Sequence, residues 1–225
     1  MHNPIIVALD VESAEEARVI VTTLGPSVSF YKVGLELYAA AGMEFVRELT
    51  GAGYEIFLDL KLYDIGETVK RAVRQISKTG VRFLTIHTPI SVMNAAVEGR
   101  GDSAMQLLGV TVLTSFDLSD LADRGCSAPV AGVVAERARK AIDAGVDGVV
   151  CSPLEAAMVR RIVGAEAIVV TPGVRSAGAG LGDQKRVATP AEAIRDGANY
   201  LVIGRQITRA ADPAAEARRI LEEIK

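Results

Sequence analysis

The segment FLDLKLYDIGETVKR, residues 57–71, places three charged residues at the end of an apolar strand pattern. They are Asp59, Lys61 and Asp64, and burying any one of them without a partner would cost several kcal/mol. Residues two apart on a strand point to the same side, so we expect Asp59 and Lys61 to be neighbours. Asp64 can fold back to Lys61 or reach across a subunit boundary.

Two more charges fit the same rim, since Asp10 ends the first strand pattern and Lys32 lies near the end of the second. An ammonium among carboxylates is favoured in its charged form, which suits Lys61 as a proton donor. The same surroundings argue against a Schiff-base lysine and, more weakly, against a metal site. The alternative is an ion-pair network with a purely structural role.

A second group of residues has the composition of a phosphate site. The glycine-rich segment 171–187 carries Arg175 and Gln184, and the last strand pattern ends with Gly204 and Arg205. Backbone N–H groups and side chains from the loops after strands seven and eight often bind phosphate in barrel proteins. The alternative for the glycine-rich segment is an ordinary surface loop.

Other polar residues at predicted strand ends are less informative. Thr114 and Ser115 end the fifth strand pattern, where hydroxyls could meet a polar ligand. His87 ends the fourth, and with no visible partner we favour a structural hydrogen-bonding role over a general base.

Eight short, apolar and β-branched runs alternate with helical patterns along the chain. The runs cover residues 4–10, 29–35, 54–62, 83–88, 106–115, 148–153, 167–174 and 200–205. Strands this apolar are typical of parallel sheets covered on both faces. We therefore predict a single-domain α/β protein, a (β/α)8 TIM barrel over residues 1–225. An open doubly wound sheet is the alternative, but VALDVESAEEA lacks the glycine fingerprint that such a fold shows after its first strand.

Composition limits the function further. The 225 residues are 49% hydrophobic, with a net charge of −3 and a pI near 5.5, which disfavours a nucleic-acid surface. The two cysteines, Cys126 and Cys151, form no disulfide framework and suggest a reducing compartment. No targeting segment or apolar run of about 20 residues is visible, so we expect no membrane partner and a cytoplasmic protein.

Taken together, these motifs resemble those of the orotidine 5'-phosphate decarboxylase family. DLKLYDIGET matches that family's D-x-K-x-x-D-I-x-x-T signature, and the resemblance extends over the whole chain. Further matches are VALD, YKVGLEL, VTVLTS, TPGVR with DQKR, and VIGR. D-x-K-x-x-D alone is shared with related sugar-phosphate enzymes.

The resemblance implies cofactor-independent decarboxylation of orotidine 5'-phosphate to uridine 5'-phosphate, a step of pyrimidine biosynthesis. Lys61 would protonate C6 of the pyrimidine, and Asp59 would sit against the departing carboxylate. The other implied contacts are Lys32 and Asp10 to ribose hydroxyls, Thr114 and Ser115 near the pyrimidine, Pro172 lining the pocket, and Arg175, Gln184, Gly204 and Arg205 at the phosphate. Asp64 and Thr68 would enter the partner subunit's site in a homodimer.

Two other readings stay open on the sequence. The nearer is a magnesium-dependent decarboxylase or aldolase acting on a sugar phosphate, which loss of activity in chelator would favour. The other is a catalytically silent phosphate-binding barrel, for which replacement of Lys61 would change nothing.

Overall fold

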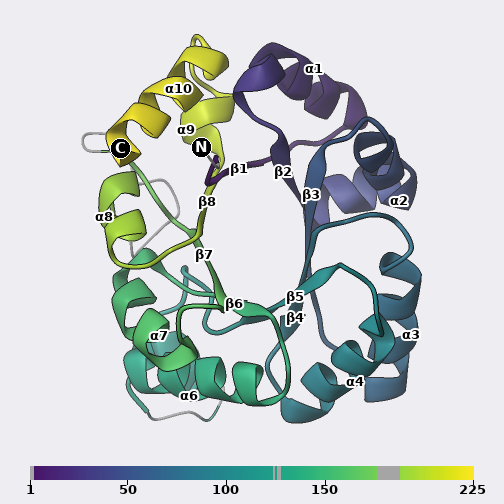
Figure 1. Ribbon diagram of the computed structural model, residues 1–225, viewed down its shortest axis with the longest axis vertical. Helices are drawn as coiled ribbons and strands as arrows, with labels where there is room; N and C mark the ends of the chain where they lie inside the picture. The colour runs from purple at the N-terminus through teal and green to yellow at the C-terminus, as the bar shows by residue number, and fades with distance from the viewer. Residues whose placement is uncertain (1–2, 124, 126–127, 177–187) are drawn as a thin grey trace.

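The computed structural model describes residues 3–123, 125, 128–176 and 188–225. Its eight parallel strands close into a barrel in chain order, which confirms the predicted (β/α)8 fold. Figure 1 shows the strands around the centre and the helices as an outer ring. The strands are β1 (Ile5–Ala8), β2 (Phe30–Gly34), β3 (Glu55–Leu62), β4 (Phe83–His87), β5 (Gln106–Val110), β6 (Gly148–Val150), β7 (Ile168–Pro172) and β8 (Tyr200–Ile203).

The helices follow the strands in the order expected of a repeated βα unit. They are α1 (Ala14–Leu24), α2 (Leu35–Gly51), α3 (Gly66–Ile76), α4 (Ile90–Arg100), α5 (Leu118–Ala122), α6 (Val130–Asp143), α7 (Ala156–Val163), α8 (Pro190–Arg195), α9 (Arg205–Thr208) and α10 (Pro213–Ile224), with short 3-10 turns at Gly25–Ser27 and Pro153–Glu155. None of the helices in these described ranges is long and apolar enough to cross a bilayer.

Local sequence explains where several helices begin. The Ser13 hydroxyl accepts a hydrogen bond from the Glu16 N–H at the start of α1, and Asp212 does the same for Ala215 ahead of α10. Thr189 and Glu192 form a reciprocal capping box at α8. Proline at the first turn of α8 and α10 has no N–H to leave unsatisfied.

The hydrophobic core has two parts, because each strand is apolar on both faces. One part lies between the barrel and the helices, and the other fills the barrel interior with Phe30, Phe57, Phe83 and Tyr200 among its larger members. Arg82 lies over the rings of Phe30, Phe83 and Tyr200 at 5.1–5.3 Å from their centroids, and pairs with Glu55. The interior is therefore packed near Arg82 and Glu55, at the amino ends of the strands. A ligand is expected at the carboxyl ends, as in other barrels of this kind.

All eight predicted strands are longer than the observed ones, and the fifth exceeds its observed length by the most. β5 ends at Val110 and not at residue 115, because β6 has only three residues and the ladder between them stops there. The Thr111 N–H and hydroxyl both donate to the Val150 carbonyl, which closes the edge of that ladder. Thr114 and Ser115 consequently lie in the loop after β5. Residues 151–153, assigned to strand six from sequence, lead into the 3-10 turn at Pro153–Glu155.

Candidate active site

A cavity of about 850 Å³ opens at the carboxyl ends of the strands. Residues from seven of the eight strands, all but β4, and from the loops after them line it, as expected for a barrel active site. Ten residues singled out from sequence are among them: Asp10, Lys32, Asp59, Lys61, Thr114, Ser115, Pro172, Arg175, Gly204 and Arg205.

Four of these residues form a row of alternating charge along one side of the cavity. The Lys32 ammonium lies 2.7 Å from Asp10 Oδ1 and 3.9 Å from Asp59 Oδ2, and the Lys61 ammonium lies 2.9 Å from the same Asp59 oxygen. The side chains of Lys32 and Asp59 are only 10% and 14% exposed, so each depends on its charged neighbours in place of water. The row has no net charge, which allows it to be partly buried.

Gly34 makes room for this row. A Cβ atom at Gly34 would lie 2.8 Å from the Lys32 ammonium and 3.2 Å from Asp10 Oδ1. Any larger residue would therefore push apart the ion pair that begins the row.

The row ends at a distortion of β3 that simple strand alternation does not predict. Leu58 pairs with Leu84 and Leu62 pairs with Ile86, so four steps along β3 match two along β4. Lys61 lies inside this bulge with φ +49°, and it is the one non-glycine residue of the described chain with positive φ. Such a conformation costs of order 1–3 kcal/mol and persists only where the surroundings hold it.

Thr85 on β4 holds the bulge, and sequence reasoning missed it. Its hydroxyl accepts a hydrogen bond from the Lys61 N–H at 2.9 Å and donates one to Asp59 Oδ1 at 2.8 Å. Thr85 is fully buried. A threonine inside a strand has the ordinary β-propensity signature, so nothing in the sequence marks it as a support for the two charged residues.

The part of the cavity that follows β7 and β8 carries the residues with phosphate-binding chemistry. Arg175 follows β7, and its N–H donates to the Ala188 carbonyl at 3.0 Å, which joins the two described ends of that loop. Gly204 directly follows β8 and Arg205 begins α9. Two guanidinium groups and a glycine backbone thus lie on one cavity wall, a set suited to an anion. Gln184 lies outside the described residues.

Asp64 and Thr68 do not line this cavity. Asp64 is exposed in the turn after β3, and its Oδ1 accepts a hydrogen bond from the Ile65 N–H at 2.6 Å instead of turning back to Lys61. Thr68 is exposed on α3. Large apolar side chains beside them are also exposed, Tyr63 at 69% and Ile65 at 77%.

His87 lines a smaller cavity of about 390 Å³, together with Tyr63, Thr88 and residues from β5 to α6. Its ring packs 5.5 Å from that of Tyr63. His87 is therefore separate from the charged row, and its structural role stays a prediction.

The arrangement can place one ammonium against a reacting atom while an anionic group is held by the arginines after β7 and β8. Lys61 is a donor fixed by Asp59, and a fixed positive charge stabilises negative charge that develops beside it. The same amine is paired with the Asp59 carboxylate, whereas a nucleophilic lysine is activated by desolvation or by a neighbouring cation.

Comparison with known proteins gives a consistent result. Residues 3–220 match the model of the orotidine 5'-phosphate decarboxylase / HUMPS family. Proteins named orotidine 5'-phosphate decarboxylase from Rhodopseudomonas palustris strains CGA009 and BisB5 are 53% and 52% identical over 98% of this chain and 93–94% of their own. The crystal structure of orotidine 5'-phosphate decarboxylase from Lactobacillus acidophilus has a TM-score of 0.88 at 37% identity and covers all of both chains.

Proposed function

Because the chain belongs to the orotidine 5'-phosphate decarboxylase / HUMPS family, we propose that it decarboxylates orotidine 5'-phosphate with Lys61 as the proton donor. The chain is a carboxy-lyase of that family. Its products would be uridine 5'-phosphate and carbon dioxide, as pyrimidine biosynthesis requires. The observation that carries the proposal is the Lys61 ammonium, held 2.9 Å from Asp59 in a cavity that two arginines after β7 and β8 also line.

The reaction leaves an electron pair on a ring carbon. When the bond from C6 to the carboxylate breaks, carbon dioxide leaves and the pair stays on C6. The positive charge of the Lys61 ammonium stabilises the negative charge on C6. Lys61 then transfers a proton to C6, so that a C–H bond replaces an N–H bond. Asp59 lies against the substrate carboxylate and repels it less once carbon dioxide has formed.

The other cavity residues fit the rest of the nucleotide. We assign Asp10 and Lys32 to the ribose hydroxyls, Thr114 and Ser115 to the pyrimidine, Pro172 to the pocket wall, and Arg175, Gly204 and Arg205 to the phosphate. For Gln184, outside the described residues, we keep the phosphate role that the family resemblance implies. Phosphate contacts far from the reacting bond can lower its barrier if their binding energy is realised only in the transition state.

We also propose that the active unit is a homodimer in which Asp64 and Thr68 enter the partner subunit's site. Both residues are exposed and neither lines the cavity of its own subunit, and the exposed Tyr63 and Ile65 next to them provide apolar surface for an interface. The cytoplasm, with its reducing conditions, is the location we propose for this enzyme.

An absorbance assay tests the decarboxylase proposal. Metal-free protein in excess chelator should bleach the orotate chromophore of orotidine 5'-phosphate at the same rate as untreated protein. A magnesium-dependent sugar-phosphate enzyme would leave the chromophore unchanged, or would lose its activity in the chelator. Release of one carbon dioxide per nucleotide consumed checks the stoichiometry.

Replacing Thr85 with valine is expected to lower kcat by about 10- to 100-fold. The change keeps the shape but leaves Asp59 Oδ1 and the Lys61 N–H without their buried partner, at a cost of about 1–3 kcal/mol in unfolding free energy. Thr171→Val is the matched control, since Thr171 is equally buried on β7 and touches neither charged residue. Thr85→Ser should recover most of kcat. Equal kcat in the two valine variants would remove Thr85 from the supporting role.

A further inference from the structure

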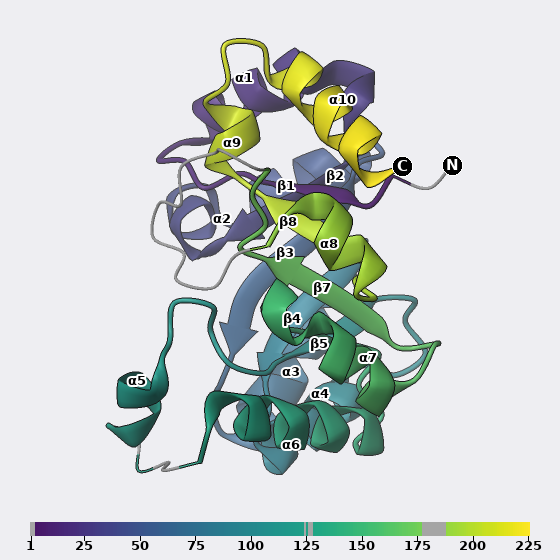
Figure 2. The same cartoon turned by 90° about the vertical axis from the view of Figure 1, so that its left-hand side faces the viewer.

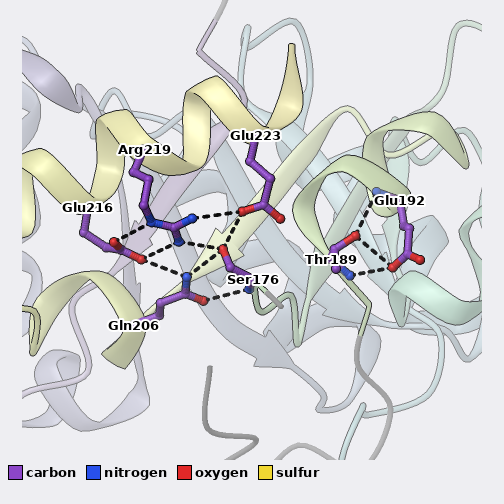
Figure 3. A network of polar contacts seen from close by, with 7 residues as sticks. All are labelled: Ser176, Thr189, Glu192, Gln206, Glu216, Arg219 and Glu223. Atoms are coloured by element: carbon purple, nitrogen blue, oxygen red, sulfur yellow. Dashed lines mark hydrogen bonds and ion pairs between the residues drawn. The ribbon is translucent and has the colours of Figure 1, made fainter. Parts of the chain in front are cut away.

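Five polar residues of the described chain form one hydrogen-bonded network (Figure 3). They are Ser176 after β7, Gln206 on α9, and Glu216, Arg219 and Glu223 on α10. None of the five lines the cavity. We call this set the Ser176 network.

The Ser176 hydroxyl uses its full hydrogen-bonding capacity within the network. It donates to Glu223 Oε2 at 2.7 Å and accepts from Gln206 Nε2 and an Arg219 terminal nitrogen, both at 2.8 Å. A hydroxyl has one donor and two acceptor lone pairs, so no capacity is left. Ser176 is only 6% exposed. Its position is therefore fixed from three directions.

Gln206 holds Ser176 at two points. Its Oε1 accepts from the Ser176 N–H at 3.2 Å, while its Nε2 donates to the Ser176 hydroxyl and, at 2.9 Å, to Glu216 Oε1. Both N–H groups of the amide are used, and rotating the amide by 180° would place its donors against the Ser176 N–H. The contacts thus allow one orientation of Gln206.

Arg219 secures the network from α10. Its guanidinium donates twice to Glu216, at 2.8 and 2.7 Å, as well as to Ser176. These hydrogen bonds hold the pKa of Glu216 below its usual range, so Glu216 stays an acceptor for Gln206 at neutral pH. The Glu216–Arg219 pair therefore keeps Gln206 in place.

The network joins the two segments that carry the arginines. Ser176 directly follows Arg175, and Gln206 directly follows Arg205. We propose that Ser176 and Gln206 are positioning residues, whose paired hydrogen bonds set the spacing of Arg175 and Arg205 for the phosphate group of the substrate. This inference rests on the proposed function, because it takes an anionic group held by the two arginines as its ligand.

A purely structural role would have a different signature. If the network only fastened α10 to the barrel, its loss would lower stability and weaken all ligands alike. A positioning role instead makes the loss specific to ligands that carry the phosphate, because only those contact both arginines.

Calorimetric measurement of the affinities for uridine 5'-phosphate and for uridine distinguishes the positioning role from the purely structural one. Gln206→Met keeps the side-chain length but cannot make the bonds, and Ser176→Ala removes the hydroxyl. We expect each variant to bind uridine 5'-phosphate about tenfold more weakly, as the loss of one or two hydrogen bonds predicts. The affinity for uridine should stay within about twofold of the wild-type value. Ser176→Thr, which keeps the hydroxyl, should restore nucleotide affinity.

Two controls come from the same helix. Arg218→Ala and Glu222→Gln alter exposed residues that bond to Ser27 and Lys225 and not to the network, and should change neither affinity. If Gln206→Met unfolds, Gln206→Glu, which keeps an acceptor but no donors, replaces it. Equal weakening of nucleotide and nucleoside, or no weakening in any variant, overturns the proposal. Absence of wild-type turnover would instead count against the decarboxylase function, because the positioning test depends only on the two affinities.

Discussion

Replacing Lys61 with alanine is expected to lower the turnover of orotidine 5'-phosphate by about 10⁴-fold or more. The variant loses both a general acid, which contributes typically 10²–10⁴-fold, and a charge beside the developing carbanion, worth about 10²–10³-fold. Single-turnover absorbance measurements at saturating substrate check the chemical step. Lys78→Ala is a matched control, because Lys78 is exposed in the turn after α3 and its ammonium bonds to Gln75 on that helix.

The backbone at Lys61 allows loss of activity to be separated from loss of structure. Its φ of +49° favours glycine, so Lys61→Gly should be at least as stable as Lys61→Ala while being equally inactive. Thermal unfolding of both variants measures this. If Lys61→Ala keeps wild-type turnover, the proton-donor mechanism is wrong, whatever the stability.

The same variant also tests the shared site in the proposed homodimer. Lys61→Ala and Asp64→Asn should each be inactive alone. If Asp64 acts in the partner's cavity, mixed dimers contain one site with both native residues, and activity should return toward a quarter of the wild-type value after subunit exchange. Mixtures that stay inactive, although exchange is shown by mass spectrometry, would falsify the shared site.

The sequence was informative where chemistry and regular geometry coincide. Charges at the ends of apolar strands are costly unless used or paired, so Asp10, Asp59 and Lys61 stood out, and closure of the barrel brings such strand ends together. The alternation of eight apolar runs with helical patterns was sufficient to predict the fold. This prediction requires each strand to be recognised, but it does not require the exact residues at which the strand begins and ends.

Features that depend on tertiary register were not predictable. The bulge at Lys61 follows from how β3 pairs with β4, and Thr85 supports it from 24 residues away. Ser176 and Gln206 likewise appear in sequence as a loop serine and a helix glutamine, 30 residues apart. In both cases the support lies on a neighbouring element, where local pattern carries no information about it.

Replacing Arg205 with alanine is expected to lower kcat/KM for the substrate that carries the phosphate far more than for orotidine, which lacks it. A guanidinium makes paired, charge-assisted hydrogen bonds to phosphate, at roughly 1.5–3 kcal/mol each. Their loss should lower kcat/KM for orotidine 5'-phosphate by about 10²-fold or more. Orotidine lacks the phosphate, so its slow turnover should change by less than about threefold.

The ratio of the loss for orotidine 5'-phosphate to the loss for orotidine shows whether Arg205 acts on the phosphate group. Arg205→Lys keeps the charge but not the planar fork, and we expect it to recover part of the lost kcat/KM for the nucleotide. Arg195→Ala, which removes an exposed arginine paired with Asp196 on α8, should leave both substrates unaffected. Equal losses for orotidine and its phosphate would mean that Arg205 acts on the barrel as a whole. A loss confined to the phosphate ester would show that binding energy from the residues after β7 and β8 is used at Lys61, which lies on a different part of the barrel, β3.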